Sequence, residues 1–212
     1  MTRDQIIEVV RTNLSQDGLD FFTSLDFTDS IQDGYNLAVG YSECIEGYET
    51  INFVSELTYY DFSTLLTNYL RPLAIFNNNT NRWLEATSLK ELQKIDYKWE
   101  TVHGEPTMFW PINFKYVALF PRPSTATGNM TIFYKKVADT LTGGTTPEIP
   151  DECVDVLEQY VTSDMLDQLE EYNKSTRYFK EMQETLEGLK KLVNKRLLPD
   201  IILRLRDQND LD

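Results

Sequence analysis

Apolar residues recur every three or four positions at the start of the chain, and this spacing predicts two helices. The first covers residues 3–14, where Thr2 and Gln5 form a Thr-x-x-Gln capping box. The second covers residues 28–47 and carries a stripe rich in tyrosine on one side. Such a stripe is typical of a helix that packs against other helices.

The same spacing returns after Pro150, which together with Asp151 favours the start of a helix. The pattern breaks at Tyr172-Asn173, and a second helix, capped at Ser175 or nearby, continues to about Lys195. Two apolar stripes joined by a short turn predict an antiparallel helical hairpin. The N-terminal helices can complete this hairpin as a bundle.

Between these helical ends the pattern changes to short β-rich runs separated by turn residues. The predicted strands are residues 51–55, 57–61, 73–76 and 82–86, with a helical turn at 63–69. The asparagine-rich run 77–81 predicts a hairpin loop, because asparagine tolerates positive φ. Arg82 and Trp83 beside it are candidates for contact with a neighbouring subunit. Ser88 and Glu91 form another capping box, for a short helix at 89–95.

The strands that follow Pro106 are apolar on both faces, so helices, a second sheet or another subunit must cover both sides. The sequence therefore predicts an α+β fold, in which N- and C-terminal helices form a bundle and the chain between them forms a central β-rich, sandwich-like insertion. An extended C-terminal tail completes the chain. The expected segments are residues 1–49 for the N-terminal helices, 50–146 for the insertion, 147–195 for the C-terminal hairpin and 196–212 for the tail.

The net charge of -14 is concentrated near the start, where residues 1–62 hold twelve acids and two bases. Affinity for phosphate backbones comes chiefly from Lys and Arg, so we expect no nucleic-acid-binding surface there. A solvated acidic face that aids solubility is one interpretation.

No pattern in the chain predicts catalysis. His103 is the only histidine and stands in a turn beside Gly104, with no partner nucleophile or metal-ligand cluster. Cys44 and Cys153 form no CxxC or Cys/His set, so we expect free thiols in a reducing cell. We therefore expect no enzyme activity, no cofactor and no metal site.

The sequence also predicts no membrane association. No apolar run approaches the roughly 18 residues that a membrane span needs. The N-terminus lacks the apolar region of a targeting segment, so we expect synthesis in the cytoplasm.

An ordered set of motifs spans residues 99–160. In chain order they are the turn Gly104-Glu105-Pro106, the aromatic pair Phe109-Trp110, the strand end Leu119-Phe120-Pro121-Arg122-Pro123, a third strand from Met130 to Val137, the Leu141 loop, and Ile149-Pro150 at the start of the long helix. This order resembles the C-terminal half of the head-to-tail adaptor (connector) proteins of tailed bacteriophages. The resemblance extends more weakly from the N-terminal helix to about Lys191. The departures lie in the Asn113-Phe114 turn and in the segment after Pro199.

The resemblance implies a structural virion protein at the head–tail junction. Its subunits would form a homo-oligomeric ring, expected to be dodecameric, beneath the portal protein. The ring would extend the DNA channel and provide the attachment site for the tail. The implied partners are the portal, neighbouring adaptor subunits and tail or nozzle proteins, with DNA passing through without specific binding.

If the protein lines a DNA channel, as the resemblance implies, the acidic residues have a second, more specific interpretation. An acidic channel wall would repel DNA and let it move through the channel without adhering. The candidate channel-facing acids are Asp26, Asp29, Asp33, Glu43 and Glu46.

The segment after Lys195 combines large apolar residues with arginines. It either packs back on its own subunit or, as is common among adaptors resembling this one, docks into the portal or an adjacent subunit. The candidate interface residues are Arg196, Leu197, Leu198, Ile201, Ile202, Leu203, Arg204, Leu205 and Arg206.

Two other functions stay open at this point. One is a different virion ring, a tail-completion or nozzle protein, which would bind the tail instead of the portal. The other is a monomeric ligand-binding module with an apolar pocket in the region of Trp83, Trp99 and Trp110.

Overall fold

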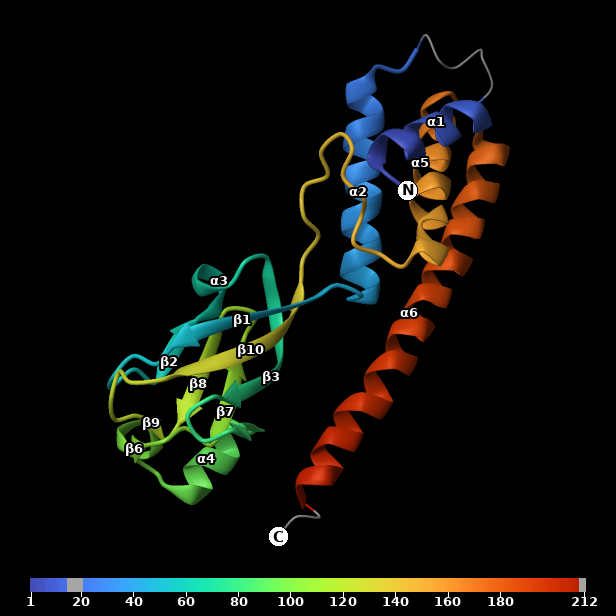
Figure 1. Ribbon diagram of the computed structural model, residues 1–212. Coiled ribbons are helices and arrows are strands. Elements are labelled where there is room, and N and C mark those ends of the chain that lie inside the picture. Colours follow the sequence, from blue (N-terminus) through green and yellow to red (C-terminus); the bar gives the residue numbers. More distant parts are fainter. Residues whose placement is uncertain (15–20, 210–212) are drawn as a thin grey trace. The chain divides into compact units, whose positions relative to one another are not determined.

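The structure is a computed structural model that describes residues 1–14 and 21–209; for Glu152 and residues 196–209 it describes only the backbone. The chain divides into two compact units (Figure 1). A helical unit comprises Met1–Ile45 and Ala138–Asp212, and a β-rich unit comprises Glu46–Val137. Helices from both ends of the chain and a central β-rich unit confirm the predicted α+β class.

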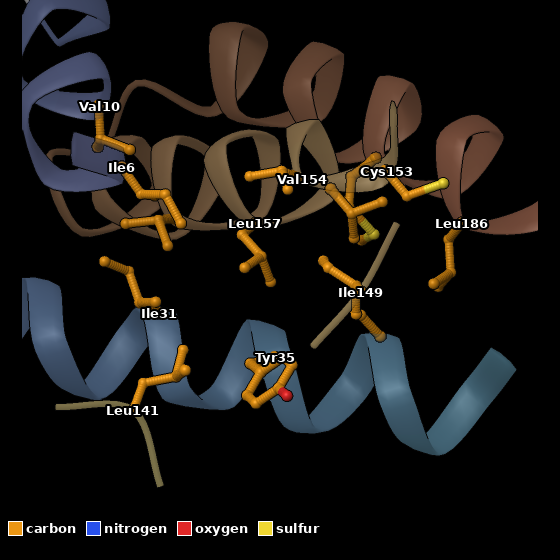
Figure 2. Packing of buried hydrophobic residues seen from close by; sticks show 14 of the residues in the cluster. Ile6, Val10, Ile31, Tyr35, Leu141, Ile149, Cys153, Val154, Leu157 and Leu186 are labelled. Atoms are coloured by element: carbon orange, nitrogen blue, oxygen red, sulfur yellow. The ribbon is translucent and has the colours of Figure 1, made fainter. Parts of the chain in front are cut away.

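The helical unit is built around one apolar core. Its elements are α1 (Arg3–Asn13), α2 (Ser24–Ser42), the short 3-10 helix η3 (Asp151–Cys153), α5 (Asp155–Gln168) and α6 (Tyr172–Asn209). Ile6, Ile31 and Leu157, from three of these helices, are fully buried in this core (Figure 2). Leu186 adds a side chain from α6, so the N-terminal and C-terminal helices share one core.

Polar side chains of α2 hold the irregular segment that precedes α5. Gln32 accepts a hydrogen bond from the Leu141 N–H at 2.8 Å and donates to the Asp139 carbonyl at 3.1 Å. The buried Tyr35 hydroxyl accepts from the Glu148 N–H at 3.1 Å, and burial raises the pKa of Tyr35 to about 12. The segment therefore has partners for its backbone groups although it lies outside regular structure.

Helix caps set the starts of the N-terminal helices. The predicted box at Thr2 and Gln5 is confirmed, since each side chain bonds the other residue's backbone N–H. A second box, Thr23 with Asp26, starts α2 at Ser24, earlier than the predicted residue 28. Helix α2 ends at Ser42, before the predicted residue 47, because Glu43 adopts a left-handed conformation with φ 51°.

The C-terminal end differs from the predicted extended tail. Helix α6 continues through Pro199 to Asn209 instead of ending near Lys195. A proline removes one helical hydrogen bond, but the leucines, isoleucines and arginines on either side are adequate helix formers. The break between α5 and α6 lies close to the predicted one, with Glu170 at φ 62° and α6 beginning at Tyr172.

The β-rich unit consists of two packed sheets and small additions. One sheet has the order β1 (Glu46–Asn52), β10 (Asn129–Lys136), β3 (Tyr69–Asn77), β4 (Arg82–Trp83). The other has the order β2 (Tyr59–Asp61), β8 (Tyr116–Phe120), β7 (Met108–Ile112), β5 (Glu85–Ala86). The additions are α3 (Phe62–Leu65), α4 (Leu89–Ile95), the 3-10 helix η2 (Trp99–Thr101) and the parallel pair β6 (His103–Gly104) and β9 (Arg122–Pro123).

Alternation along β8 shows how both faces of its sheet are covered. Val117 and Leu119 enter the core between the sheets, where they join Ile75 and Ile132. Ala118, on the opposite face, packs with Leu92 of α4 in a second cluster. A second sheet and a helix thus cover the apolar strands, as the sequence required.

The asparagine-rich run forms the predicted loop, between the antiparallel strands β3 and β4. The Asn77 side chain accepts hydrogen bonds from the backbone N–H groups of Asn79 and Thr80, and Asn81 has φ 54°. Asn79 lies directly against Gly128, where φ is 93° and an added Cβ would come within 1.9 Å of the amide oxygen. Glycine is favoured there because another residue would be strained at this positive φ, and its Cβ would also displace the Asn79 side chain.

Glu49 links β1 to the turn after α3. One of its carboxylate oxygens accepts from the Thr67 N–H at 3.0 Å and from the Tyr134 hydroxyl at 2.9 Å. These hydrogen bonds hold the pKa of Glu49 below its ordinary value near 4.5. The bond from Thr67 contributes most, the bond from Tyr134 adds to it, and burial acts in the opposite direction. Because the folded pKa is lowered, this stabilisation is present above the unfolded pKa and is lost as pH falls through the folded pKa.

We therefore expect Glu49→Gln, which keeps an accepting oxygen but removes the charge, to lower the free energy of unfolding by about 1 kcal/mol at pH 7. The difference from the parent protein should shrink between pH 7 and pH 3, because the parent carboxylate is increasingly protonated as pH falls toward its folded pKa. Urea unfolding at both pH values measures it, with the exposed Glu85→Gln as the matched control. Equal losses at the two pH values would contradict the charge argument.

Candidate interaction surfaces

Aromatic side chains form a row across the outer face of the sheet β1-β10-β3-β4. The members of this aromatic row are Tyr48, Phe133, Trp83 and Phe76, in order of contact. Successive ring centroids are 6.0, 5.5 and 5.1 Å apart. Strand register brings them together, since Tyr48 pairs with Phe133 and Phe76 pairs with Trp83. Their sequence neighbours Ile132 and Ile75 point the other way, into the core.

The row is open to solvent and uncharged along one border. Tyr48 is 73% exposed, and the other rings are half-buried. Beside it the hydroxyls of Thr50 and Thr131 lie 2.9 Å apart, and the Asn78 amide donates to Thr131 at 3.0 Å. Aromatic rings bury large areas at low entropic cost and are enriched at the centres of protein interfaces. This face is therefore suited to contact with another protein.

Sequence reasoning found only part of this surface. Trp83 was singled out beside the asparagine loop, but the other three rings were not. The sequence signal for the other rings is the alternation of side chains along a strand. Tyr48 and Phe133 each stand between residues whose side chains point to the opposite face of the sheet. What alternation cannot give is the pairing of β1 with β10.

The acids predicted to face a channel have differing local roles. Asp26, Asp29 and Asp33 are exposed and, at spacings of three and four residues, share one side of α2. Asp26 also caps the helix, and hydrogen bonds from Thr23 hold its pKa below the ordinary value. Glu43 is the C-cap residue. Glu46 pairs with Lys135, whose side chain is fully buried, at 2.7 Å.

The predicted interface residues of the C-terminal segment, 196–206, lie on the helical backbone of α6. Their side chains are outside the described residues. The described core of the helical unit reaches Leu189 and Val193 on the same helix, just ahead of this segment.

His103 belongs to a small exposed network. Its Nδ1 lies 3.0 Å from Glu56, its Nε2 accepts from Arg122 at 2.6 Å, and Arg122 pairs with Glu56 at 2.9 Å. These contacts join β6 to β9 and to the turn after β1. Among the described residues, no group of three or more His, Cys, Asp or Glu is arranged to hold a metal ion. Within the same part of the chain, no helix is long and apolar enough to cross a membrane.

The tryptophans proposed for a ligand pocket divide between two clusters. Trp99 and Trp110 contact each other, with ring centroids 6.1 Å apart, in the small core that includes Leu92. Trp83 belongs to the aromatic row on the other sheet. In the part of the chain that the structure describes, Cys44 and Cys153 are not joined in a disulfide; Cys153 is buried and Cys44 partly buried.

Comparison with known proteins supports the resemblance seen in the motifs. The sequence matches the family model described as SU10 adaptor protein over residues 1–201. No curated protein matches the chain. The matched region includes the whole β-rich unit, the ordered motifs of residues 99–160 and the helical unit as far as residue 201. The chain therefore belongs to the SU10 adaptor protein family, a family of structural phage adaptors.

Proposed function

We propose that the protein is a virion subunit that assembles as a homo-oligomeric, dodecameric ring beneath the portal. The ring extends the DNA channel and provides the attachment site for the tail. The observation that carries this proposal is the adaptor family match over residues 1–201, which covers nearly the whole chain.

The aromatic row supports self-assembly. The four rings form a contiguous row that is open to solvent, and contiguous exposed patches of this kind are typical of protein interaction sites; Tyr48, its most exposed member, is 73% exposed. We propose that the row contacts a different surface of the next subunit, because a ring of more than two subunits is built from heterologous contacts whose rotation closes.

Exposed acids support the channel. Asp29 and Asp33 lie on one side of α2 and, among the described residues, form no ion pair that would neutralise them. If that side faces the channel, like-charge repulsion keeps DNA from adhering. A structure of the ring with these carboxylates pointing away from its axis would reject this part of the proposal.

Light scattering after size exclusion tests the main proposal, applied to the protein alone and mixed with the portal protein of the same phage. The expected result is a portal-sized species that gains about one copy of this chain per portal subunit. A chain that stays separate from the portal but joins a tail protein would instead indicate a tail-completion ring.

The aromatic row yields a direct prediction. Tyr48→Ser should change the free energy of unfolding by no more than about 0.5 kcal/mol, because the ring is largely exposed. It should weaken assembly about tenfold or more if the row is a subunit contact. To measure the effect, each variant is mixed with portal protein at a series of concentrations, and the mass of the assembled rings is measured at each. Tyr97→Ser is the matched control, since Tyr97 is 85% exposed in the same unit and outside the row. Equal assembly of both variants would exclude the row from the interface.

A further inference from the structure

An open pocket of about 370 Å³ lies between α5 and α6 within the helical unit. Its lining residues are Tyr160, Ser163, Asp164 and Asp167 from α5 and Ser175, Thr176 and Phe179 from α6. The volume is at the low end of the range for small-ligand sites, about 300–1,000 Å³. It is therefore suited to one large side chain or a small molecule.

The base of the pocket is polar, neutral and fixed. Ser163 and Ser175 are buried, their hydroxyls lie 3.2 Å apart, and Ser163 also donates to the Ser175 carbonyl at 3.0 Å. Asp164 is held in place because its carboxylate accepts from the Ser30 hydroxyl of α2 at 2.6 Å. These bonds set the shape of the pocket without using the second carboxylate, that of Asp167.

The charge of the pocket is negative and uncompensated. Asp167 is exposed and, in the part of the chain that the structure describes, neither it nor Asp164 forms an ion pair. Burial, and after it the charges of Asp164 and Asp33, raise the pKa of the Tyr160 phenol. A ligand that carries positive charge fits this environment.

The aromatic side chains that line the pocket, Tyr160 and Phe179, favour a guanidinium over other cations. Tyr160 is packed against α2, where a Cβ added at Gly34 would lie 2.8 Å from its ring, so its position is restricted. Phe179 stands on α6 with 45% of its surface exposed. A planar guanidinium can stack on aromatic rings while it donates two parallel hydrogen bonds to a carboxylate, whereas an ammonium cannot do both.

We propose that this pocket receives an arginine side chain presented by a neighbouring protein of the virion. The assignment of the partner rests on the proposed adaptor function, whereas the assignment of arginine rests on the pocket. Asp164 and Asp167 accept from the guanidinium, and Tyr160 and Phe179 flank it.

The test is a titration of the ¹⁵N-labelled full-length protein with N-acetyl-arginine amide at constant ionic strength, followed by NMR. We expect shifts confined to residues 160–167 and 175–179 and a dissociation constant on the order of 1 mM. The citrulline analogue, which has nearly the same shape without the charge, should leave the spectrum unchanged. The lysine analogue should bind several-fold more weakly.

Variants identify the carboxylates. Asp167→Asn should weaken binding of the arginine amide about fivefold, since it removes a charge-assisted hydrogen bond and breaks no side-chain hydrogen bond or ion pair of Asp167 among the described residues. Glu184→Gln, an exposed carboxylate of α6 outside the pocket, should leave binding unchanged. Equal binding of the citrulline or lysine analogue, shifts elsewhere on the protein, or no shifts at all would overturn the proposal.

The two proposals fail separately. If the chain does not join the portal but the arginine amide binds, the adaptor role fails and the pocket assignment stands. If the chain joins the portal and the amide does not bind, the pocket assignment alone is wrong.

Discussion

Replacing Glu46 with alanine is expected to lower the free energy of unfolding of the β-rich unit by about 3 kcal/mol. Glu46 lies opposite Lys135 in the β1–β10 register, and its carboxylate is 2.7 Å from Nζ of that residue. The Lys135 side chain is fully buried, whereas that of Glu46 is half exposed. Removing the carboxylate therefore leaves a buried charge without its partner. This loss of stability is at the lower end of the range for buried ion pairs, because Glu46 is half exposed and water can enter the space that its side chain leaves.

The same argument predicts an asymmetry between the two partners. Lys135→Met removes the buried charge and fills its space with apolar atoms, so it should cost much less than Glu46→Ala. Glu181→Ala, which breaks the exposed pair with Arg177 on α6, is the control and should cost about 0.5 kcal/mol or less. Chemical denaturation of the three variants measures these differences. A larger loss in Lys135→Met than in Glu46→Ala would contradict the account.

Local signals were the most reliable guide to the fold. The capping boxes at Thr2 and Ser88 fix their helices within a few residues, so the sequence locates them without knowledge of the rest of the chain. The box at Thr23 was not predicted; it carries Asp26 at the N3 position, where the usual capping box has Glu or Gln. That omission explains why α2 begins earlier than predicted.

Non-local features could not be read in the same way. Phe133 of β10 lies beside Tyr48 of β1, because these two strands pair in the sheet although β2 to β9 lie between them in the sequence. Periodicity shows which side of its own strand a residue occupies, but not which strand lies beside it. The aromatic row and the pocket between α5 and α6 both depend on such pairings, so they appear only in the folded chain.

The C-terminal segment shows the opposite error, in which a local signal was given too much weight. Pro199 predicted a boundary between the bundle helix and an extended tail, yet α6 passes through it to Asn209. The residues around it favour a helix, and one lost hydrogen bond did not outweigh them. The segment is thus a continuation of a helix whose earlier part belongs to the core.

Deleting residues 197–212 is expected to abolish attachment to the portal, in keeping with the proposal that this segment docks into it. The helical unit should still fold, because its described core residues on α6 end at Val193. The deletion removes the end of α6, so the helical circular dichroism signal should fall in proportion to the lost residues while the thermal transition is retained. Light scattering of the variant mixed with portal protein measures attachment.

A full-length variant separates the chemistry of the segment from its length. Replacing Leu198, Ile202 and Leu205 with glutamine keeps the helix formers and the arginines but removes apolar surface that a docking site would bury. If burial of these side chains drives attachment, this variant should fail to join the portal as the deletion does. Attachment that survives both changes would reject docking by this segment, whereas loss in the deletion alone would assign attachment to the arginines or to the helical backbone.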